Sequence, residues 1–195
     1  MFSTYNLNKK KLRKIILIHG LFSSSGYWLP YISSLKNFNL IVLNIDYIEF
    51  LKEPKNNLNK FLNQINNIKN VDIVISHSLG TIIASHIDIK ANFINICPVH
   101  KAKRINKEKF VSLISSQIGL KPIMIQDVLK TVDSTDFTFN KNLQKDKVLN
   151  FFPTDDEYFD YNADLSFNNV FFKGDHFEIS NIFKIKHMQE LLGDK

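Results

Sequence analysis

The sequence contains a single cysteine, Cys97, so it cannot form an intramolecular disulfide and is compatible with a reducing compartment. It also lacks an apolar run of the roughly 20 residues that a membrane-spanning helix requires. The basic N-terminal segment does precede apolar residues, but His19 and Gly20 interrupt them before they form a signal-peptide core. These absences lead us to expect a cytoplasmic protein without a membrane span, in which Cys97 is a small buried residue rather than a nucleophile.

Motifs for nucleotide and metal binding are absent as well. The chain has neither a P-loop nor a G-x-G-x-x-G sequence, and it has no H-E-x-x-H pair. Its net charge of +6 over 195 residues is modest for a nucleic-acid-binding protein, and no aromatic-basic motif accompanies it. We therefore expect no cofactor, no metal ion and no nucleic-acid partner.

What the chain does have is enough apolar material for one buried core: 44% of its residues are hydrophobic, 17 of them phenylalanine. Short apolar runs without polar alternation are typical of strands buried on both faces. Such runs occur at 15–18, 40–45, 71–75, 93–97, 148–152 and 169–173. Helical patterns separate most of them, at 28–36, 54–68, after Ser78 and at 180–192. This alternation predicts a three-layer α/β sandwich with a mostly parallel sheet of about six strands.

One connection is longer than a simple crossover. About fifty residues separate Cys97 from Val148, and they include two amphipathic segments at 107–118 and 123–132. The first segment carries an apolar stripe made of Phe110, Val111, Leu113, Ile114 and Ile118. From the pattern alone, these residues form a crossover helix with a decorated loop.

Ser78 stands at the centre of the most informative motif, Ser76-His77-Ser78-Leu79-Gly80. The motif follows a predicted strand and precedes a predicted helix, which is the context of the G-x-S-x-G nucleophile elbow. The tight turn requires small residues on both sides; Gly80 meets this requirement, and Ser76 replaces glycine on the near side. We expect a strained but intact elbow, in which the backbone N–H of Leu79 begins the helix and is available to an oxyanion.

Other candidate residues also follow predicted strands. A His-Gly turn follows the first strand, acidic residues at 155–157 follow the 148–152 strand, and His176 follows the last strand. The nucleophile, acid and histidine therefore come in the order Ser, Asp, His, which separates one serine-triad fold from the others. On these motifs the chain resembles the α/β-hydrolases from about residue 14 to residue 192.

The resemblance implies a catalytic site with Ser78 as nucleophile and His176 as base, His100 being the second choice for the base. The family's strand-Gly-x-x-Asp pattern, laid over residues 148–157, places Pro153 at the glycine and Asp156 at the acid; Asp155 is the alternative acid. By the same resemblance, the second oxyanion donor is the backbone N–H of Leu21. It also implies that residues 99–146 form a small helical lid within a single domain, 1–195.

The function that follows is a serine esterase or thioesterase acting on a small acyl ester or thioester. Basic residues cluster at the start of the predicted lid, and such a rim would suit an acidic acyl carrier protein: Lys101, Lys103, Arg104, Lys107 and Lys109. The chain is also similar to pimeloyl-acyl-carrier-protein methyl ester esterases of biotin synthesis in its His-Gly turn, elbow and lid. The alternatives are a non-catalytic binding module on the same fold, and C–C, amide or peptide hydrolysis by the same triad.

Overall fold

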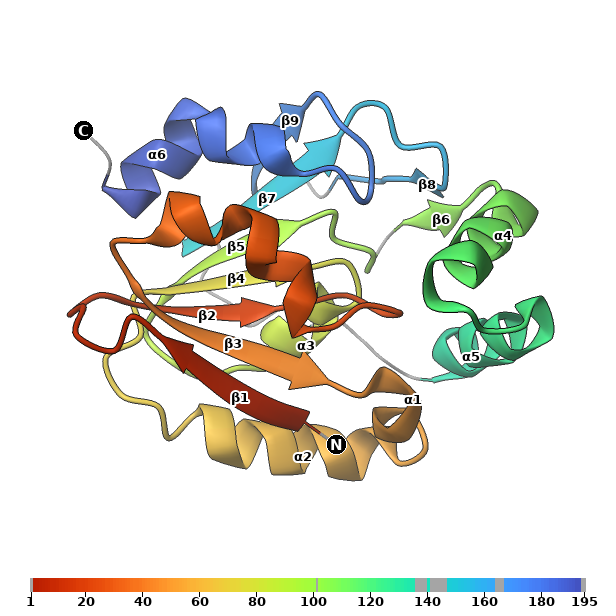
Figure 1. Ribbon diagram of the computed structural model, residues 1–195, viewed down its shortest axis with the longest axis horizontal. Coiled ribbons are helices and arrows are strands. Elements are labelled where there is room, and N and C mark those ends of the chain that lie inside the picture. Colours follow the sequence, from red (N-terminus) through yellow and green to blue (C-terminus); the bar gives the residue numbers. More distant parts are fainter. Residues whose placement is uncertain (1, 101, 136–139, 141–146, 164–166, 194–195) are drawn as a thin grey trace.

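A seven-stranded, mostly parallel sheet forms the centre of the protein (Figure 1). The structure is a computed structural model that describes residues 2–100, 102–135, 140, 147–163 and 167–193. The strand order across the sheet is β1-β3-β2-β4-β5-β7-β9. The strands are β1 (Phe2–Leu7), β2 (Lys14–Ile18), β3 (Asn39–Ile45), β4 (Ile73–His77), β5 (Asn92–Ile96), β7 (Val148–Pro153) and β9 (Asn168–Phe172).

The six parallel strands lie where the apolar runs predicted them, and the sheet has one further strand. β1 pairs antiparallel with β3, from Phe2 opposite Ile45 to Leu7 opposite Leu40. Its side chains from Ser3 to Leu7 are exposed, so this edge strand is held mainly by backbone hydrogen bonds. Because a strand that buries little leaves no apolar run in the sequence, burial patterns could not predict it.

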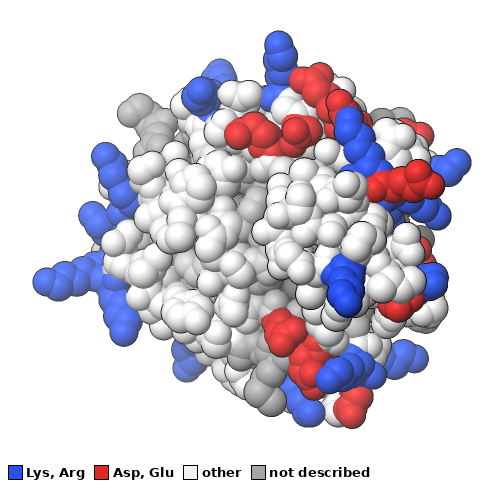
Figure 2. All heavy atoms as spheres, turned by 45° about the vertical axis from the view of Figure 1, so that its right-hand side comes forward, with Lys and Arg blue, Asp and Glu red and all other residues white. Residues whose placement is uncertain are grey.

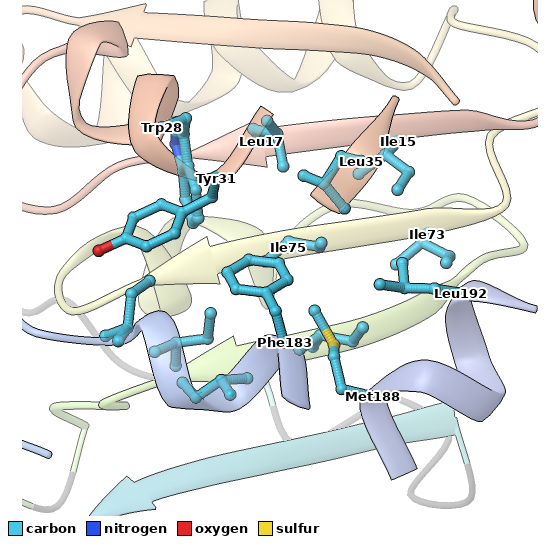
Figure 3. Packing of buried hydrophobic residues seen from close by; sticks show 14 of the residues in the cluster. Ile15, Leu17, Trp28, Tyr31, Leu35, Ile73, Ile75, Phe183, Met188 and Leu192 are labelled. Carbon is cyan, nitrogen blue, oxygen red and sulfur yellow. The ribbon is translucent and has the colours of Figure 1, made fainter. Parts of the chain in front are cut away.

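One face of the sheet is covered by η1 (Ser25–Leu35), η3 (Ser180–Lys184) and α6 (Lys186–Leu192). Figure 3 shows Trp28, Tyr31 and Leu35 of η1 packed with Phe183, Met188 and strand residues such as Ile75. The helix predicted at 28–36 is a 3-10 helix that contains Pro30. The one predicted at 180–192 is divided at Ile185, whose extended backbone separates η3 from α6.

The opposite face is covered by α1 (Tyr47–Phe50), α2 (Pro54–Ile65) and α3 (Gly80–Ala84). Successive side chains of β2 point to opposite faces of the sheet. Ile15 and Leu17 pack on the face covered by η1, η3 and α6, and Ile16 and Ile18 pack on the face covered by α1, α2 and α3. Covering both faces explains why the parallel strands are apolar at nearly every position.

The connection from β5 to β7 contains a helical pair, α4 (Lys107–Ile118) and α5 (Pro122–Ser134), close to the predicted segments. In Figure 1 this pair lies beyond the carboxyl ends of the parallel strands. A two-residue strand before it, β6 (Lys103–Arg104), pairs antiparallel with β8 (Phe159–Asp160). A third apolar cluster joins the pair to the segment after β7: Phe110, Val111, Ile114, Ile125, Leu129 and Tyr158.

Candidate active site

Ser78 lies at the turn between β4 and α3 with a φ of 53°, a left-handed conformation that non-glycine residues rarely adopt. Gly80 permits this turn, because a Cβ at that position would lie 2.6 Å from the carbonyl oxygen of His19. Gly20 permits the close approach of the neighbouring turn, because a Cβ there would lie 2.8 Å from the Cβ of Ser78. The strand-turn-helix geometry of an elbow is therefore present, with strain at the residue that carries the hydroxyl.

Ser76, which stands where glycine was expected, takes part in a buried polar row. Its Oγ donates to Asn95 Oδ1 at 2.9 Å, and Asn95 Nδ2 donates to Asn150 Oδ1 at 3.0 Å. Asn150 Nδ2 continues the row to Asn169 Oδ1 at 3.1 Å, so the row crosses four neighbouring strands. A buried hydroxyl is costly unless it is hydrogen-bonded, and this row satisfies it.

Three buried side chains meet at the carboxyl edge of the sheet. His176, which follows β9, places its Nε2 2.8 Å from Ser78 Oγ. Its Nδ1 lies 3.3 Å from Oδ2 of Asp156, which follows β7. The imidazole therefore stands between a hydroxyl and a carboxylate, as general-base activation of a serine requires.

The Asp156 carboxylate is held by several donors. Its Oδ1 accepts from the backbone N–H groups of Tyr158 at 2.8 Å and Phe159 at 3.1 Å. Burial alone would raise the pKa of Asp156, but the hydrogen bonds from His176, Tyr161 and the Tyr158 amide outweigh burial and lower this pKa. The carboxylate is accordingly ionised at neutral pH.

The alternative candidates lie elsewhere. Asp155 is exposed, and its carboxylate accepts from Thr154 Oγ1 at 3.1 Å. Two histidines, His77 and His176, are among the described residues that line the cavity beside Ser78; His100 is not. His77 Nε2 donates to the carbonyl oxygen of His176 at 2.7 Å, which links the residue before the nucleophile to the histidine loop.

Two aromatic residues near His176 were not expected from the sequence. The Tyr161 hydroxyl lies 2.6 Å from Asp156 Oδ2 and 2.7 Å from His176 Nδ1. The Phe159 ring stacks on the imidazole of His176, with centroids 4.4 Å apart and planes inclined by 26°. Phe159 belongs to the two-residue strand β8 in the segment after β7, and Tyr161 follows it; a strand this short has no detectable periodicity, so no sequence signal marked either residue.

The same segment anchors the helical pair. Ile105 N donates to the Tyr158 carbonyl at 2.9 Å, and Asn106 Nδ2 donates to the Glu157 carbonyl at 2.6 Å. Lys109 of α4 forms an ion pair with the Glu157 carboxylate. The start of α4 is thus fixed to the segment that carries Asp156.

A cavity of about 230 Å³ opens beside the Ser78 hydroxyl. Figure 2 shows this end of the molecule hollowed near its middle, with mostly uncharged residues around the hollow and charged ones towards the margin. Ser23, Arg104, Gln117 and Asp133 contribute to the lining, but most of it is apolar: Leu21, Phe22, Leu79, Ile82, Val99, Phe110, Ile114, Leu129, Val132, Phe159 and Phe177. Leu21 and Leu79, the residues predicted to supply oxyanion donors, both line the cavity with Ser78.

His19 holds the turn that carries Leu21. Its Nε2 accepts from Ile45 N at 2.9 Å, and its Nδ1 donates to the Gly20 carbonyl at 2.8 Å. Its own carbonyl accepts from the Tyr47 hydroxyl at 2.5 Å. Burial lowers the pKa of His19 from 6.5 to about 4, although the bond to Gly20 opposes this shift. The neutral ring is therefore part of the scaffold of the turn.

This lowered pKa predicts destabilisation by acid. Because the unfolded chain binds a proton at His19 near pH 6.5 and the folded chain only near pH 4, stability is full above about pH 6.5 and falls as the pH drops towards 4. The shift corresponds to about 3 kcal/mol in the free energy of unfolding, measured by urea denaturation at pH 7 and pH 4.5. His19→Gln should flatten this pH dependence, whereas exposed His187→Gln should not; equal slopes in all three proteins would contradict the assignment.

Ion pairs with acidic residues neutralise part of the predicted basic rim. Lys101 lies outside the described residues. Arg104 forms an ion pair with Asp133, and Lys109 forms the pair with Glu157 described above. Lys103 and Lys107 are exposed, and Lys103 lies opposite Asp160 in the β6–β8 pair.

The described part of the chain contains no group of three His, Cys, Asp or Glu side chains placed to hold a metal ion. Nor does any described helix have the length and hydrophobicity needed to cross a membrane. Cys97 is buried, and burial raises the pKa of its thiol, so it stays protonated at neutral pH.

No family model matches the sequence, and no curated protein matches it either. Solved structures do. The 2-hydroxy-6-oxo-6-phenylhexa-2,4-dienoate hydrolase of a Rhodococcus strain is 12% identical with a TM-score of 0.66, over 98% of this chain and 93% of that one. A type II thioesterase from the borrelidin biosynthetic cluster is 11% identical with a TM-score of 0.60, over the same shares. A carboxylesterase from Bacillus subtilis is 13% identical with a TM-score of 0.58, over 98% and 86%.

These similarities cover nearly the whole chain and most of each neighbour, so the protein has the α/β-hydrolase fold that its motifs predicted. At 11–13% identity the similarity concerns the fold. Because one fold supports many reactions, the reaction depends on the residues of the site.

Proposed function

We propose that this protein is a serine hydrolase that cleaves a carboxylic ester or thioester, with Ser78 as nucleophile, His176 as base and Asp156 as acid. The observation that carries the proposal is the contact of 2.8 Å between Ser78 Oγ and His176 Nε2 at the wall of an apolar cavity. The ionised, buried Asp156 carboxylate on the other side of the imidazole supports the same assignment.

The proposed reaction has two steps, acylation and deacylation of Ser78. Ser78 Oγ attacks the acyl carbon while its proton passes to His176 Nε2, and the tetrahedral oxyanion faces the backbone N–H groups of Leu21 and Leu79. Collapse of this intermediate breaks the bond to the alcohol or thiol, which leaves with the proton from His176. A water molecule then gives a proton to His176 and attacks the acyl carbon of the acyl-enzyme. The carboxylic acid product departs as Ser78 regains a proton from His176.

The cavity lining indicates which part of the substrate it holds. Its walls are mostly aliphatic and aromatic, and the two charged lining residues, Arg104 and Asp133, pair with each other, so the walls favour an apolar acyl or alkyl group over a charged one. Phe110 and Ile114 of α4, with Leu129 and Val132 of α5, form one wall. We therefore assign the helical pair as a lid within a single domain, the lid comprising the described part of residues 99–146.

Hydrolysis of a substrate panel tests the proposal. Aryl esters and acyl thioesters with apolar acyl groups should be hydrolysed with measurable kcat and KM, while anilides and C–C-cleavage substrates should be hydrolysed far more slowly. Turnover confined to anilides or to C–C bonds would move the protein to a different reaction class. No turnover on any substrate would favour a binding module on the hydrolase fold.

A narrower form of the proposal makes the substrate an acyl chain on an acidic carrier protein, as in pimeloyl-acyl-carrier-protein methyl ester cleavage. The exposed lysines at 103 and 107 support it, because they lie at the start of the lid. The ion pairs of Arg104 and Lys109 weaken it, because they reduce the positive charge of this rim.

Charge reversal at the two exposed lysines tests the carrier hypothesis. Lys103→Glu with Lys107→Glu should raise KM for an acyl-carrier thioester about tenfold and leave a small thioester unchanged, because rim charges act mainly on association. Lys55→Glu with Lys60→Glu on α2 makes the same change of charge at another surface and should affect neither substrate. An unchanged KM for the carrier substrate would reject the carrier and leave the small-molecule ester or thioester.

A further inference from the structure

The Tyr161 hydroxyl occupies the space between the acid and the base. It lies 2.6 Å from Asp156 Oδ2 and 2.7 Å from His176 Nδ1, whereas the direct distance from Oδ2 to Nδ1 is 3.3 Å. Hydrogen bonds of good geometry have donor–acceptor distances of about 2.5–3.2 Å. The two shorter contacts are therefore those made by the Tyr161 hydroxyl, which links Asp156 to His176.

Counting protons fixes the direction of these bonds. Burial raises the pKa of Tyr161 and the ionised Asp156 carboxylate adds to the effect, so the phenol keeps its single proton. The ionised Asp156 can only accept, so Tyr161 donates to Oδ2 and presents a lone pair to His176 Nδ1. Nδ1 must then carry the imidazole hydrogen, which leaves Nε2 free to accept the proton of Ser78.

We propose that Tyr161 is a positioning residue that transmits the orientation set by Asp156 to His176 and selects the imidazole tautomer able to activate Ser78. This inference rests on the proposed function, since the tautomer matters only if His176 acts as a base. Tyr161 contacts the acid and the base, and its role is exerted through His176.

The packing around Tyr161 holds its hydroxyl in this place. Its ring meets Phe152 edge-on, with centroids 5.6 Å apart, and lies 6.1 Å from the ring of Phe159. Phe159 in turn stacks on His176. A ring confined in this way loses little side-chain entropy when it bonds to both partners, and phenylalanine can replace it without leaving a cavity.

The experiment compares Tyr161→Phe with Tyr158→Phe, which removes a phenol from the same segment while Tyr161 is kept. The expected result for Tyr161→Phe is a fall in kcat of about tenfold to a hundredfold with KM nearly unchanged, the usual effect of losing a hydrogen bond to a charged group. Nitrogen-15 NMR of the imidazole should show Nδ1–H as the dominant neutral form in the wild type and a redistribution towards Nε2–H in Tyr161→Phe. Tyr158→Phe should show the wild-type pattern.

A double-mutant cycle separates transmission from simple packing. In Asp156→Asn the two backbone N–H groups retain the carbonyl oxygen at the Oδ1 position, so the amide nitrogen faces Tyr161 and donates to it. The Tyr161 proton must then turn to Nδ1, which yields the wrong tautomer. Adding Tyr161→Phe to Asp156→Asn should therefore reduce kcat by less than about threefold, whereas independent roles would multiply the two losses.

These outcomes also distinguish this inference from the proposed function. The NMR measurement needs no substrate, so it tests Tyr161 even in a protein that hydrolyses nothing. An unchanged tautomer, or losses that multiply in the double mutant, would overturn the role of Tyr161 and leave Ser78 and His176 unaffected.

Discussion

Ser78→Ala should lower kcat for ester hydrolysis by about 10⁶-fold, the largest effect we expect from any single substitution. The substitution removes the only atom that can bond to the acyl carbon, while the neighbouring amides and the cavity stay in place. Alanine at this position keeps the same left-handed backbone, so the fold and melting temperature should be retained. Steady-state kinetics and thermal melting of the two proteins measure both expectations.

Ser116→Ala is the matched control, because Ser116 is an exposed serine on α4 whose hydroxyl bonds to the Leu113 carbonyl. Its kcat should equal that of the wild type. If Ser78→Ala kept more than about one per cent of wild-type turnover while folded, the nucleophile would lie elsewhere and the proposed mechanism would be wrong. Cys97 is a poor substitute nucleophile, since burial keeps its thiol protonated.

Asp156→Asn is expected to have the second largest effect, a fall in kcat of about 10⁴-fold. The amide nitrogen that takes the place of Oδ2 can only donate hydrogen bonds. It therefore cannot accept from Tyr161 or His176, and the imidazole is left in the wrong tautomer. The position itself should remain well packed, because Oδ1 can still accept from the Tyr158 and Phe159 amides. The loss should accordingly appear in kcat, with a small change in the free energy of unfolding.

Asp155→Asn provides the control one residue away. Its exposed carboxylate is bonded to Thr154, so the substitution should change kcat by no more than about twofold. If Asp155→Asn caused the large loss and Asp156→Asn the small one, the acid would be Asp155 and the loop would adopt a different register in solution.

The parallel strands and the elbow could be predicted from the sequence because both depend on local patterns. Strands buried on two faces have to be apolar at successive positions, as Ile15 to Ile18 are. The elbow has to place a small residue two positions after its serine, and Gly80 shows why, with no room for a Cβ. The exposed strand β1 has no such requirement, and its existence depends on the neighbouring edge of β3.

The parts of the site that could not be predicted depend on contacts between distant segments. Tyr161 lies in a segment without helical or strand periodicity, so no pattern in the sequence indicates that its hydroxyl contacts His176. The basic residues near position 104 looked like a charged rim, but Asp133 and Glu157, 29 and 48 residues from their partners, pair with two of them. A cluster of like charges in the sequence does not reveal which distant residues form ion pairs with it.

Covalent labelling shows whether Ser78 is an activated nucleophile without the need for a substrate. A fluorophosphonate should add one equivalent to the wild-type protein, and peptide mass spectrometry should locate the adduct on Ser78. Ser78→Ala should gain no mass, and Tyr161→Phe should be labelled more slowly at the same residue. A folded wild-type protein that stays unlabelled, or an adduct on any residue other than Ser78, would mean that Ser78 is not the nucleophile.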